Sequence, residues 1–402
     1  MKKETCRLCK SRDLKMFLDL GHHPHSDNFR KDPNLPETTY PLRLVQCQEC
    51  QFVQLDYTVS PEVLYDEDYL YESSITKTAD KHWTEFVDDV IVKTGIETGR
   101  VLDIGSNDGT LLSKFKAKGF EVMGIDPCKD ITDIANSRGI PTICSLFNVK
   151  PFLAVDSDSH VYTKDTFDLI TGSNVFAHID DLDSVIADVK MLLNPNGVFI
   201  FESPYIGDFI DKLEYDTTYH QHLSYLAVSP LVKFLAHHDM EIFNIEFTPI
   251  HGGCFRCYIA RKNEREIAPI VAETANKENF TIDVLDSFAE KVKENKVKLL
   301  EIILNFKKQG RKVVAISSPA KGQTLLNYTG AGKFIDFATD VSKLKQGRYT
   351  PGTQLLIKSD KELAGDEVGL LLAWNFAEEI MNNVPQIKTW IIPIPTPTIV
   401  ER

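Results

Sequence analysis

Four cysteines near the N-terminus are the residues whose types and spacing most clearly indicate chemistry. They form two Cys-x-x-Cys pairs, Cys6 with Cys9 and Cys47 with Cys50. Two such pairs supply four thiolates, and structural Zn²⁺ is usually held tetrahedrally by four protein ligands. Because this arrangement leaves no position for water, we expect structural zinc and no catalysis at the metal. The alternative is four free thiols or one reduced dithiol pair.

Other thiols and imidazoles could compete for the metal. Cys254 and Cys257 lie in a strand-like run, where alternation would put the two side chains on opposite faces. We therefore interpret them as unpaired cysteines. His22, His23 and His25 are alternative zinc ligands, but we expect these loop histidines to face solvent or a ligand.

A glycine turn predicts a nucleoside-binding site. The run VLDIGSNDGTLL, residues 101–112, places a buried strand before a turn that contains Gly105 and Gly109 and leads into a helix. Glycine lets the backbone approach a ligand where a Cβ atom would collide. The next strand ends at Asp126, whose carboxylate can accept both ribose hydroxyls of a bound nucleoside.

Charge in this turn favours one class of nucleoside. The spacing departs from the G-x-G-x-x-G of dinucleotide sites, and Asn107 and Asp108 occupy the turn. Asp103 and Asp108 would repel a pyrophosphate, whereas S-adenosylmethionine carries a sulfonium and an ammonium. We therefore expect S-adenosylmethionine, with a bare structural turn as the alternative. Asn174 and His178 follow a later strand, at the sheet edge where ligands collect; a core histidine is an equal alternative for His178.

Apolar runs predict the elements that position these residues. Buried strands are expected at 101–105, 121–125, 168–175 and 197–203. Helical patterns lie between them, and this alternation is the signature of a parallel α/β sheet. The strand character of residues 241–260 predicts further strands, with antiparallel pairing as one possibility.

Three modules are expected from these patterns. They are a zinc-binding module (1–66), a Rossmann-like methyltransferase core (67–265) and a C-terminal α/β Rossmann-like domain (266–402). In the last of these, a charged helix over roughly 280–309 precedes a strand, a turn and a helix over 312–328. Apolar runs at 370–374 and 390–394 complete a second small sheet.

Composition excludes several classes of function. The net charge is −13 and the isoelectric point is about 5.4. Neutralising phosphates needs clustered Lys and Arg, so this balance argues against broad nucleic-acid or anionic-membrane binding. The N-terminal MKKETCRLCK has no apolar stretch after its lysines, and no run of about 18 apolar residues occurs. We therefore expect a cytoplasmic protein.

These residues carry a resemblance that spans nearly the whole chain. Besides the two cysteine pairs, its motifs are DIGSNDGTLL, SNVFAHIDDLD, TYHQHLSY, HGG-x-x-R, SPAKGQTLLNY, KQGRYTPGT and PIPTP. The chain resembles the nucleotide-sugar C-methyltransferases of deoxysugar biosynthesis, which methylate C3 of a 4-keto-6-deoxyhexose. The resemblance implies an active site between the central and C-terminal domains, zinc in the N-terminal module, and a monomer.

The resemblance also implies roles for single residues. In Tyr219-His220-Gln221-His222 the second histidine, His222, is the base that removes the C3 proton. A histidine suits this step because catalytic pKa values are best near the working pH. The resulting enolate needs a donor or cation at its oxygen, and Tyr219, His220 and Tyr225 are the local candidates.

Further contacts are expected around the two ligands. Lys321 opens a helix after a strand, and Lys345 and Arg348 lie in a second loop, so all three could hold a pyrophosphate. Asn327 belongs to the same substrate-binding motif as Lys321. A Tyr-Ser segment with Tyr71 and Ser73 is similar to one that lies near the donor in the family.

Three departures from the family pattern bear on the substrate. Gln221 stands in place of a glutamate, Ser317 and Ser318 precede the PAKG motif, and the segment 340–349 lacks an arginine and a histidine. The last two fall where nucleotide contacts are expected, so the sugar could be linked to dTDP, GDP or CDP. The alternatives are O- or N-methylation of another small molecule, or a catalytically dead zinc-bearing scaffold.

Overall fold

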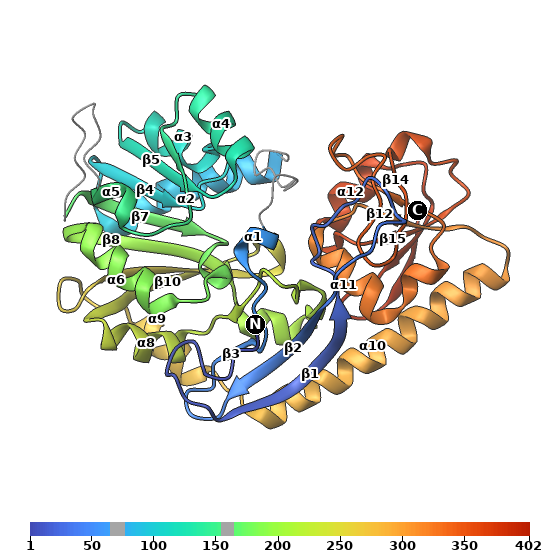
Figure 1. The fold of residues 1–402 in the computed structure, drawn as a ribbon, viewed down its shortest axis with the longest axis horizontal. Coiled ribbons are helices and arrows are strands. Elements are labelled where there is room, and N and C mark those ends of the chain that lie inside the picture. Colours follow the sequence, from blue (N-terminus) through green and yellow to red (C-terminus); the bar gives the residue numbers. More distant parts are fainter. Residues whose placement is uncertain (65–76, 154–164) are drawn as a thin grey trace.

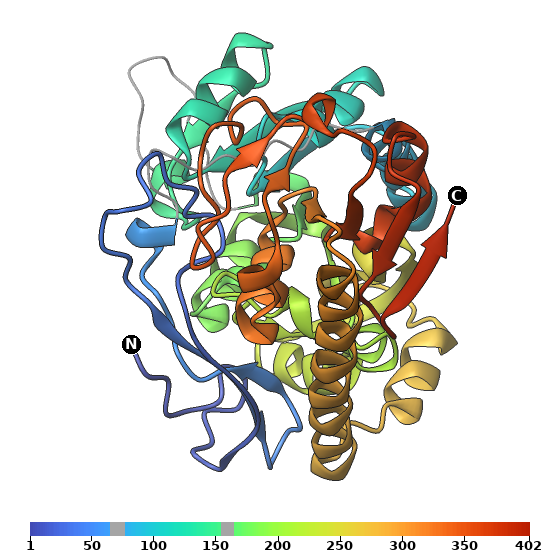
Figure 2. The same cartoon turned by 90° about the vertical axis from the view of Figure 1, so that its right-hand side faces the viewer.

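The computed structural model describes residues 1–64, 77–153 and 165–402, which contain three β-sheets (Figure 1). The central sheet lies at the left of Figure 1 and the C-terminal sheet at the right, with the N-terminal sheet below and between them. Turned by 90°, the molecule shows its two chain ends on opposite sides (Figure 2). Among the helices described, none is long and apolar enough to cross a membrane.

The N-terminal sheet is antiparallel and is completed from far along the chain. Its strands are β1 (Leu14–His23), β2 (Tyr40–Cys47), β3 (Val53–Leu55) and β9 (Ser224–Tyr225), in that order, and the short helix α1 (Pro61–Leu64) follows β3. β9 pairs Tyr225 with Val53 and Ser224 with Gln54. The segment that precedes β9 is therefore held against the N-terminal module.

The central sheet has seven strands in the order β10-β11-β8-β7-β4-β5-β6. They are β4 (Arg100–Ile104), β5 (Glu121–Asp126), β6 (Thr142–Cys144), β7 (Phe167–Ser173), β8 (Leu193–Pro204), β10 (Met240–Thr248) and β11 (Cys254–Arg261). The five from β8 to β6 are parallel, whereas β11 is antiparallel to both β8 and β10. The predicted buried strands and the antiparallel continuation are thus confirmed.

Helices cover this sheet and connect its strands. They are α2 (Lys77–Thr94), α3 (Thr110–Ala117), α4 (Lys129–Ser137), α5 (Lys150–Leu153), α6 (Leu182–Leu192), α7 (Ile206–Asp211), α8 (Val228–His237) and α9 (Pro269–Lys277). Because β4, β5, β7 and β8 run in the same direction, their carboxyl ends meet at one edge. That edge is where the glycine turn, Asp126 and Asn174 lie.

The C-terminal sheet has the order β14-β13-β12-β15-β16-β17, parallel except for β17. Its strands are β12 (Val313–Ile316), β13 (Ala338–Thr339), β14 (Ile357–Lys358), β15 (Val368–Leu371), β16 (Thr389–Ile392) and β17 (Thr398–Glu401), with helices α11 (Ala320–Thr329) and α12 (Ala377–Asn383). This is the second α/β sheet that the sequence predicts.

The long helix α10 (Ile282–Lys308) joins the three parts (Figure 1). Leu285, Phe288, Val292, Leu299 and Ile303 are buried and recur at helical spacing on it. One continuous cluster of buried apolar side chains includes this face, β1, α7 and the C-terminal sheet. The parts that carry the candidate site are therefore packed against one another.

Candidate functional site

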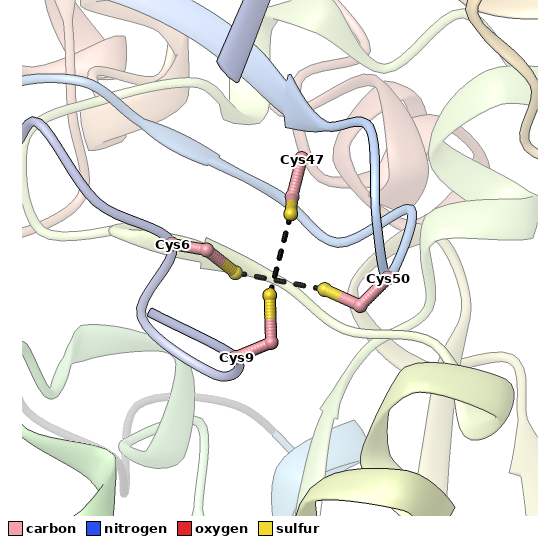
Figure 3. Close-up of side chains that lie close together, drawn as sticks. All are labelled: Cys6, Cys9, Cys47 and Cys50. Atoms are coloured by element: carbon pink, nitrogen blue, oxygen red, sulfur yellow. Dashed lines mark hydrogen bonds between the residues drawn. The ribbon is translucent and has the colours of Figure 1, made fainter. Parts of the chain in front are cut away.

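The four N-terminal cysteines converge, as Figure 3 shows. Their four sulfur atoms all lie within 4.8 Å of one another, with 3.6 Å between Cys6 and Cys50 and 3.4 Å between Cys9 and Cys47. No other group of three or more potential ligands is found in the described parts of the chain. Four converging sulfur donors fit the tetrahedral coordination of structural Zn²⁺.

Both cysteine pairs are shaped by the same local turn. Lys10 and Gln51, which follow the second cysteine of each pair, have φ values of 64° and 61°. Their backbone N–H groups donate to the carbonyl oxygens of Cys6 and Cys47 at 3.1 and 2.9 Å. This repeated turn aims both sulfur atoms of a pair to one side, which is what a chelating pair requires.

The competing ligands lie elsewhere. Cys254 and Cys257 are fully buried in β11. His23 and His25 are buried as well, so these two do not face solvent, and their facing a ligand stays a prediction. His23 ends β1, and its Nε2 lies 2.8 Å from the Leu20 carbonyl oxygen, an interaction that stabilises the buried imidazole.

A cavity of about 710 Å³ gathers most of the remaining predicted residues. The central domain contributes Asp103, Gly105, Asn107, Asp126, Asn174 and His178; the loop before β9 contributes Tyr219, Gln221 and His222; the C-terminal domain contributes Lys321 and Lys345. Asp27 of the N-terminal module completes the wall. Residues from all three parts of the chain therefore share one site.

The glycine turn is tight on both sides. Gly105 and Gly109 have φ values of 68° and 78°, which side chains rarely adopt. A Cβ atom on Gly105 would lie 3.0 Å from Val175 Cγ2, and one on Gly109 would lie 2.9 Å from Ile140 Cγ2. Gly105 lines the cavity, whereas Gly109 packs behind it at the start of α3.

Two carboxylates form the floor of the donor end. Asp126 accepts the backbone N–H groups of Asn107 at 3.0 Å and Cys128 at 2.9 Å, which fixes its orientation. Burial is the main cause that raises the pKa of Asp126. Asp103 accepts the Thr171 hydroxyl at 2.7 Å, and burial raises its pKa to about 7. A cationic ligand at this end would favour the ionised form of both groups.

Asp108 is placed differently from the other predicted residues of the turn. It is buried outside the cavity lining, where it accepts the Thr110 hydroxyl at 2.6 Å and Arg138 Nη1 at 2.8 Å. This geometry assigns it to holding α4 against the turn. Tyr71 and Ser73 lie outside the described residues.

His222 and Tyr219 form a hydrogen-bonded pair in the middle of the cavity. His222 Nδ1 lies 2.8 Å from the Thr217 carbonyl oxygen, which can only accept, so Nδ1 carries the proton. In the neutral ring Nε2 is then the basic nitrogen, and the Tyr219 hydroxyl donates to it at 2.6 Å. The ring of His178 lies 5.1 Å away, and burial lowers its pKa to about 4.

His220 and Tyr225 lie outside the cavity lining. His220 is fully buried, with its ring 5.8 Å from that of Tyr40, and burial lowers its pKa to about 4. Tyr225 packs on Phe209 with 4.8 Å between ring centroids. Because neither side chain lines the cavity, this geometry gives no support to their predicted contact with an enolate oxygen.

Two lysines of the C-terminal domain reach the cavity. Lys321 Nζ lies 4.1 Å from the centre of the Trp374 ring and donates to Asn375 Oδ1. Lys345 Nζ donates to the Ser318 carbonyl oxygen at 2.9 Å. Both ammonium groups remain available to a further acceptor, since an ammonium has three donors.

Arg348 and Asn327 have contacts outside this lining. Arg348 Nη1 donates to the Phe29 carbonyl oxygen at 3.0 Å, which ties the C-terminal domain to the N-terminal module. Asn327 Nδ2 donates to the carbonyl oxygens of Gln323 and Pro351. Their predicted role at the substrate has no support from this placement.

A buried acidic pair behind Lys321 was not foreseen from the sequence. Asp216 is fully buried and accepts Trp374 Nε1 at 2.7 Å. Burial and the neighbouring Asp216 raise the pKa of Glu214 to about 8. Burial lowers the pKa of Lys321, while Asp216 and Glu214 raise it. Their only signal in the sequence is two acids shortly before the YHQH motif.

Family models match three successive parts of the chain. A zinc binding domain matches residues 6–65, a methyltransferase domain residues 77–242, and a C-methyltransferase C-terminal domain residues 249–395. C-methyltransferase NovU of Streptomyces niveus is 30% identical over 412 residues, which cover 99% of this chain and 97% of NovU.

Other similar proteins match less than half of this chain. The ubiquinone biosynthesis O-methyltransferase of Vibrio cholerae is 24% identical over 37% of this chain and 63% of its own length. An S-adenosylmethionine-dependent methyltransferase structure from Clostridium acetobutylicum is 15% identical with a TM-score of 0.34, covering 46% of this chain and 92% of that one. The relative that spans the full chain, together with the three domain models and the cluster of four cysteines, places this chain in the family of zinc-binding, S-adenosylmethionine-dependent C-methyltransferases.

Proposed function

We propose that this enzyme methylates C3 of a nucleotide-linked 4-keto-6-deoxyhexose, with His222 as the base. The observation that carries the proposal is the Tyr219–His222 pair, whose basic Nε2 faces the same cavity as the donor turn and the two lysines. A carbon next to a ketone becomes nucleophilic once it loses a proton, and a basic imidazole can take that proton.

The residues support the following sequence of steps. His222 Nε2 takes the C3 proton, and the electron pair left on carbon moves onto the C4 oxygen as an enolate. The Tyr219 hydroxyl, freed from Nε2 by the incoming proton, turns to donate to that oxygen. S-adenosylmethionine, when bound, supplies an electrophilic methyl group: the C3–methyl bond forms as the sulfur–methyl bond breaks, with its electron pair left on sulfur. The Nδ1–Thr217 hydrogen bond keeps the neutral imidazole in the tautomer that can take the proton, and it still holds the ring once Nε2 is protonated.

The nucleotide is expected on the side of the C-terminal domain. Lys321 and Lys345 reach the cavity from there and can each offer an ammonium to a diphosphate. In a chain of net charge −13, two cations directed into one cavity favour an anionic ligand at that place. Whether the nucleotide is thymidine, guanosine or cytidine diphosphate is left to the assay. We also keep the cytoplasmic location and the monomer as predictions.

The test is turnover of a panel of thymidine-, GDP- and CDP-linked 4-keto-6-deoxyhexoses with S-adenosylmethionine. NMR of the product locates the new methyl group: a methyl on C3 supports the proposal, and one on oxygen or nitrogen refutes it. The same sugars in D₂O without the donor isolate the first step, since the wild type should exchange the C3 proton.

His222→Asn is the variant that probes the base. It should lose both methylation and C3 exchange while it keeps its affinity for S-adenosylmethionine. Loss of a general base typically costs about 10²–10⁴-fold in rate. Wild-type exchange in this variant would remove His222 from the mechanism. His237→Asn, on α8, is the matched control.

A further inference from the structure

Gln221 carries a buried polar atom that the mechanism above does not use. The side chain is 2% exposed and lines the cavity. Its amide nitrogen donates to Asp27 Oδ2 at 2.8 Å. Its oxygen Oε1 is buried without a hydrogen-bond partner among the residues that the structure describes. A buried acceptor left unpaired is destabilising, so a group that donates to it is expected when the site is filled.

The orientation of this amide is fixed by its neighbour. A flipped amide would place Oε1 against the carboxylate of Asp27, and two acceptors repel each other. Asp27 therefore determines that Gln221 presents an oxygen, and not an NH₂ group, in the other direction. Burial raises the pKa of Asp27, and the nearby Lys345 lowers it. Lys345 thus favours the ionised carboxylate, which can only accept, and in this state the amide orientation is fixed.

The pair lies on the side of the cavity where we expect the sugar to bind. Asp27 comes from the N-terminal module, and Lys345, the cation that acts on it, from the C-terminal domain. Gln221 directly precedes His222, and a turn in which the His222 N–H donates to the Tyr219 carbonyl oxygen holds both residues. Since Gln221 is next in sequence to the proposed base and both residues line the cavity, we expect the pair to lie near the reacting carbon of a bound sugar. On a 4-keto sugar, the donors in that region are the hydroxyls on C2 and C3.

We propose that Asp27 and Gln221 form a specificity-determining pair that accepts a hydrogen bond from the C2 or C3 hydroxyl of the sugar. This inference rests on the proposed function and deepens it. The pair replaces the water that would otherwise accept from that hydroxyl, and a site built to hydrogen-bond a hydroxyl discriminates strongly against the analogue that lacks it. The enzyme should therefore prefer the hydroxylated sugar at this ring position over its deoxy counterpart.

The test compares sugars with and without each hydroxyl. The probes are thymidine-, GDP- and CDP-linked 4-keto-6-deoxyhexoses, each beside its 2-deoxy and 3-deoxy counterparts. Removing the hydroxyl that the pair contacts should lower kcat/KM by about tenfold or more. The counterpart that loses activity identifies the carbon. Equal kcat/KM for all three sugars overturns the inference and leaves the proposed function standing, whereas no C-methylation of any sugar overturns both.

Substitutions of the two residues distinguish a role of this pair in sugar selectivity from a general loss of structure. Asp27→Ala should reduce the preference for the hydroxylated sugar towards one, with an unchanged dissociation constant for S-adenosylmethionine. Gln221→Glu sets two carboxyl groups against each other and should also reduce the preference. The double variant Asp27→Asn/Gln221→Glu reverses the amide and the acid, restores one hydrogen bond and two acceptors, and should recover much of it.

The control is Asp32→Asn, which alters an exposed acid of the same loop. Its preference should match that of the wild type. If the double variant folds, as its melting curve would show, but is no more selective than Gln221→Glu, the pairing argument is wrong. A change in preference in Asp32→Asn equal to that in Asp27→Ala would also overturn it.

Discussion

Replacing Asp103 by Asn should remove a pH dependence from the stability of the protein. Asp103 is 4% exposed, and burial raises its pKa from 3.8 to about 7. In the unfolded chain the carboxyl is ionised above about pH 4. Between these values the folded protein binds more protons than the unfolded chain, so the free energy of unfolding falls as the pH rises.

The magnitude follows from the size of the shift. At about 1.36 kcal/mol for each pKa unit, the ionised carboxylate costs the folded protein about 4 kcal/mol above pH 7, and almost nothing at pH 4. The amide of Asp103→Asn keeps an oxygen for the Thr171 hydroxyl, which donates to Asp103 Oδ1 at 2.7 Å. The variant should therefore match the wild type near pH 3, exceed its stability by about 1.5–2 kcal/mol at pH 5, and exceed it by about 4 kcal/mol at pH 8.

The assay is urea unfolding of wild type and variant at half-unit steps from pH 5 to 8, without added donor. The exposed Glu97→Gln is the control and should follow the wild type throughout. Wild-type and Asp103→Asn curves that stay parallel over this range would refute the reasoning. A second measurement uses the donor itself: the affinity for S-adenosylmethionine should rise with pH through about 7 in the wild type and stay flat in the variant, since only an ionised Asp103 attracts an ammonium.

Three further predictions concern other parts of the molecule. Cys47→Ser should lower the zinc content measured by atomic emission to well below one per chain, whereas the same change at the exposed Cys144 should not. Gly105→Ala should weaken donor binding in calorimetry by about tenfold, because a left-handed backbone costs an alanine roughly 1–2 kcal/mol and its Cβ would crowd Val175; an unchanged affinity would contradict this. Glu214→Gln should remove a step near pH 8 from the profile of kcat/KM, because the pKa of Glu214 is raised to about 8; a profile identical to that of the wild type would argue against it.

Local patterns account for what could be predicted from the sequence. The cysteine pairs needed only their own spacing, since the turn that follows each pair is built from neighbouring residues. The glycine turn and Asp126 could be predicted in the same way, because a strand, a turn and a helix that follow one another in the sequence fix where the strand ends. Each of these signals lies within one short segment of the chain: a single cysteine pair, or the stretch from β4 to the end of β5.

The remainder depends on contacts between distant segments. Nothing near Gln221 indicates Asp27, which lies 194 positions away and reaches it through the packing of the N-terminal module. Asp216 meets Trp374 across 158 positions in the same way. His220 is buried with its ring 5.8 Å from that of Tyr40, a residue 180 positions earlier in the chain. The pairing of β9 with β3 is equally hard to predict, because a strand of two residues is too short to show a pattern.

The pairing of β9 with β3 suggests a structural role for a zinc ion that has no open coordination position. Cys47 ends β2, β2 pairs with β3, and β3 pairs with β9, two residues beyond the base His222. The Leu55 N–H also donates to the Leu223 carbonyl oxygen at 3.0 Å, next to that base. The zinc module thus supplies one wall of the catalytic loop, and the loop has only a 3₁₀ turn and a two-residue strand of its own to hold its shape. A metal-bound turn at the end of β2 limits the positions that β3 and this loop can adopt, so under the proposed mechanism loss of the zinc should disturb the geometry of Tyr219 and His222.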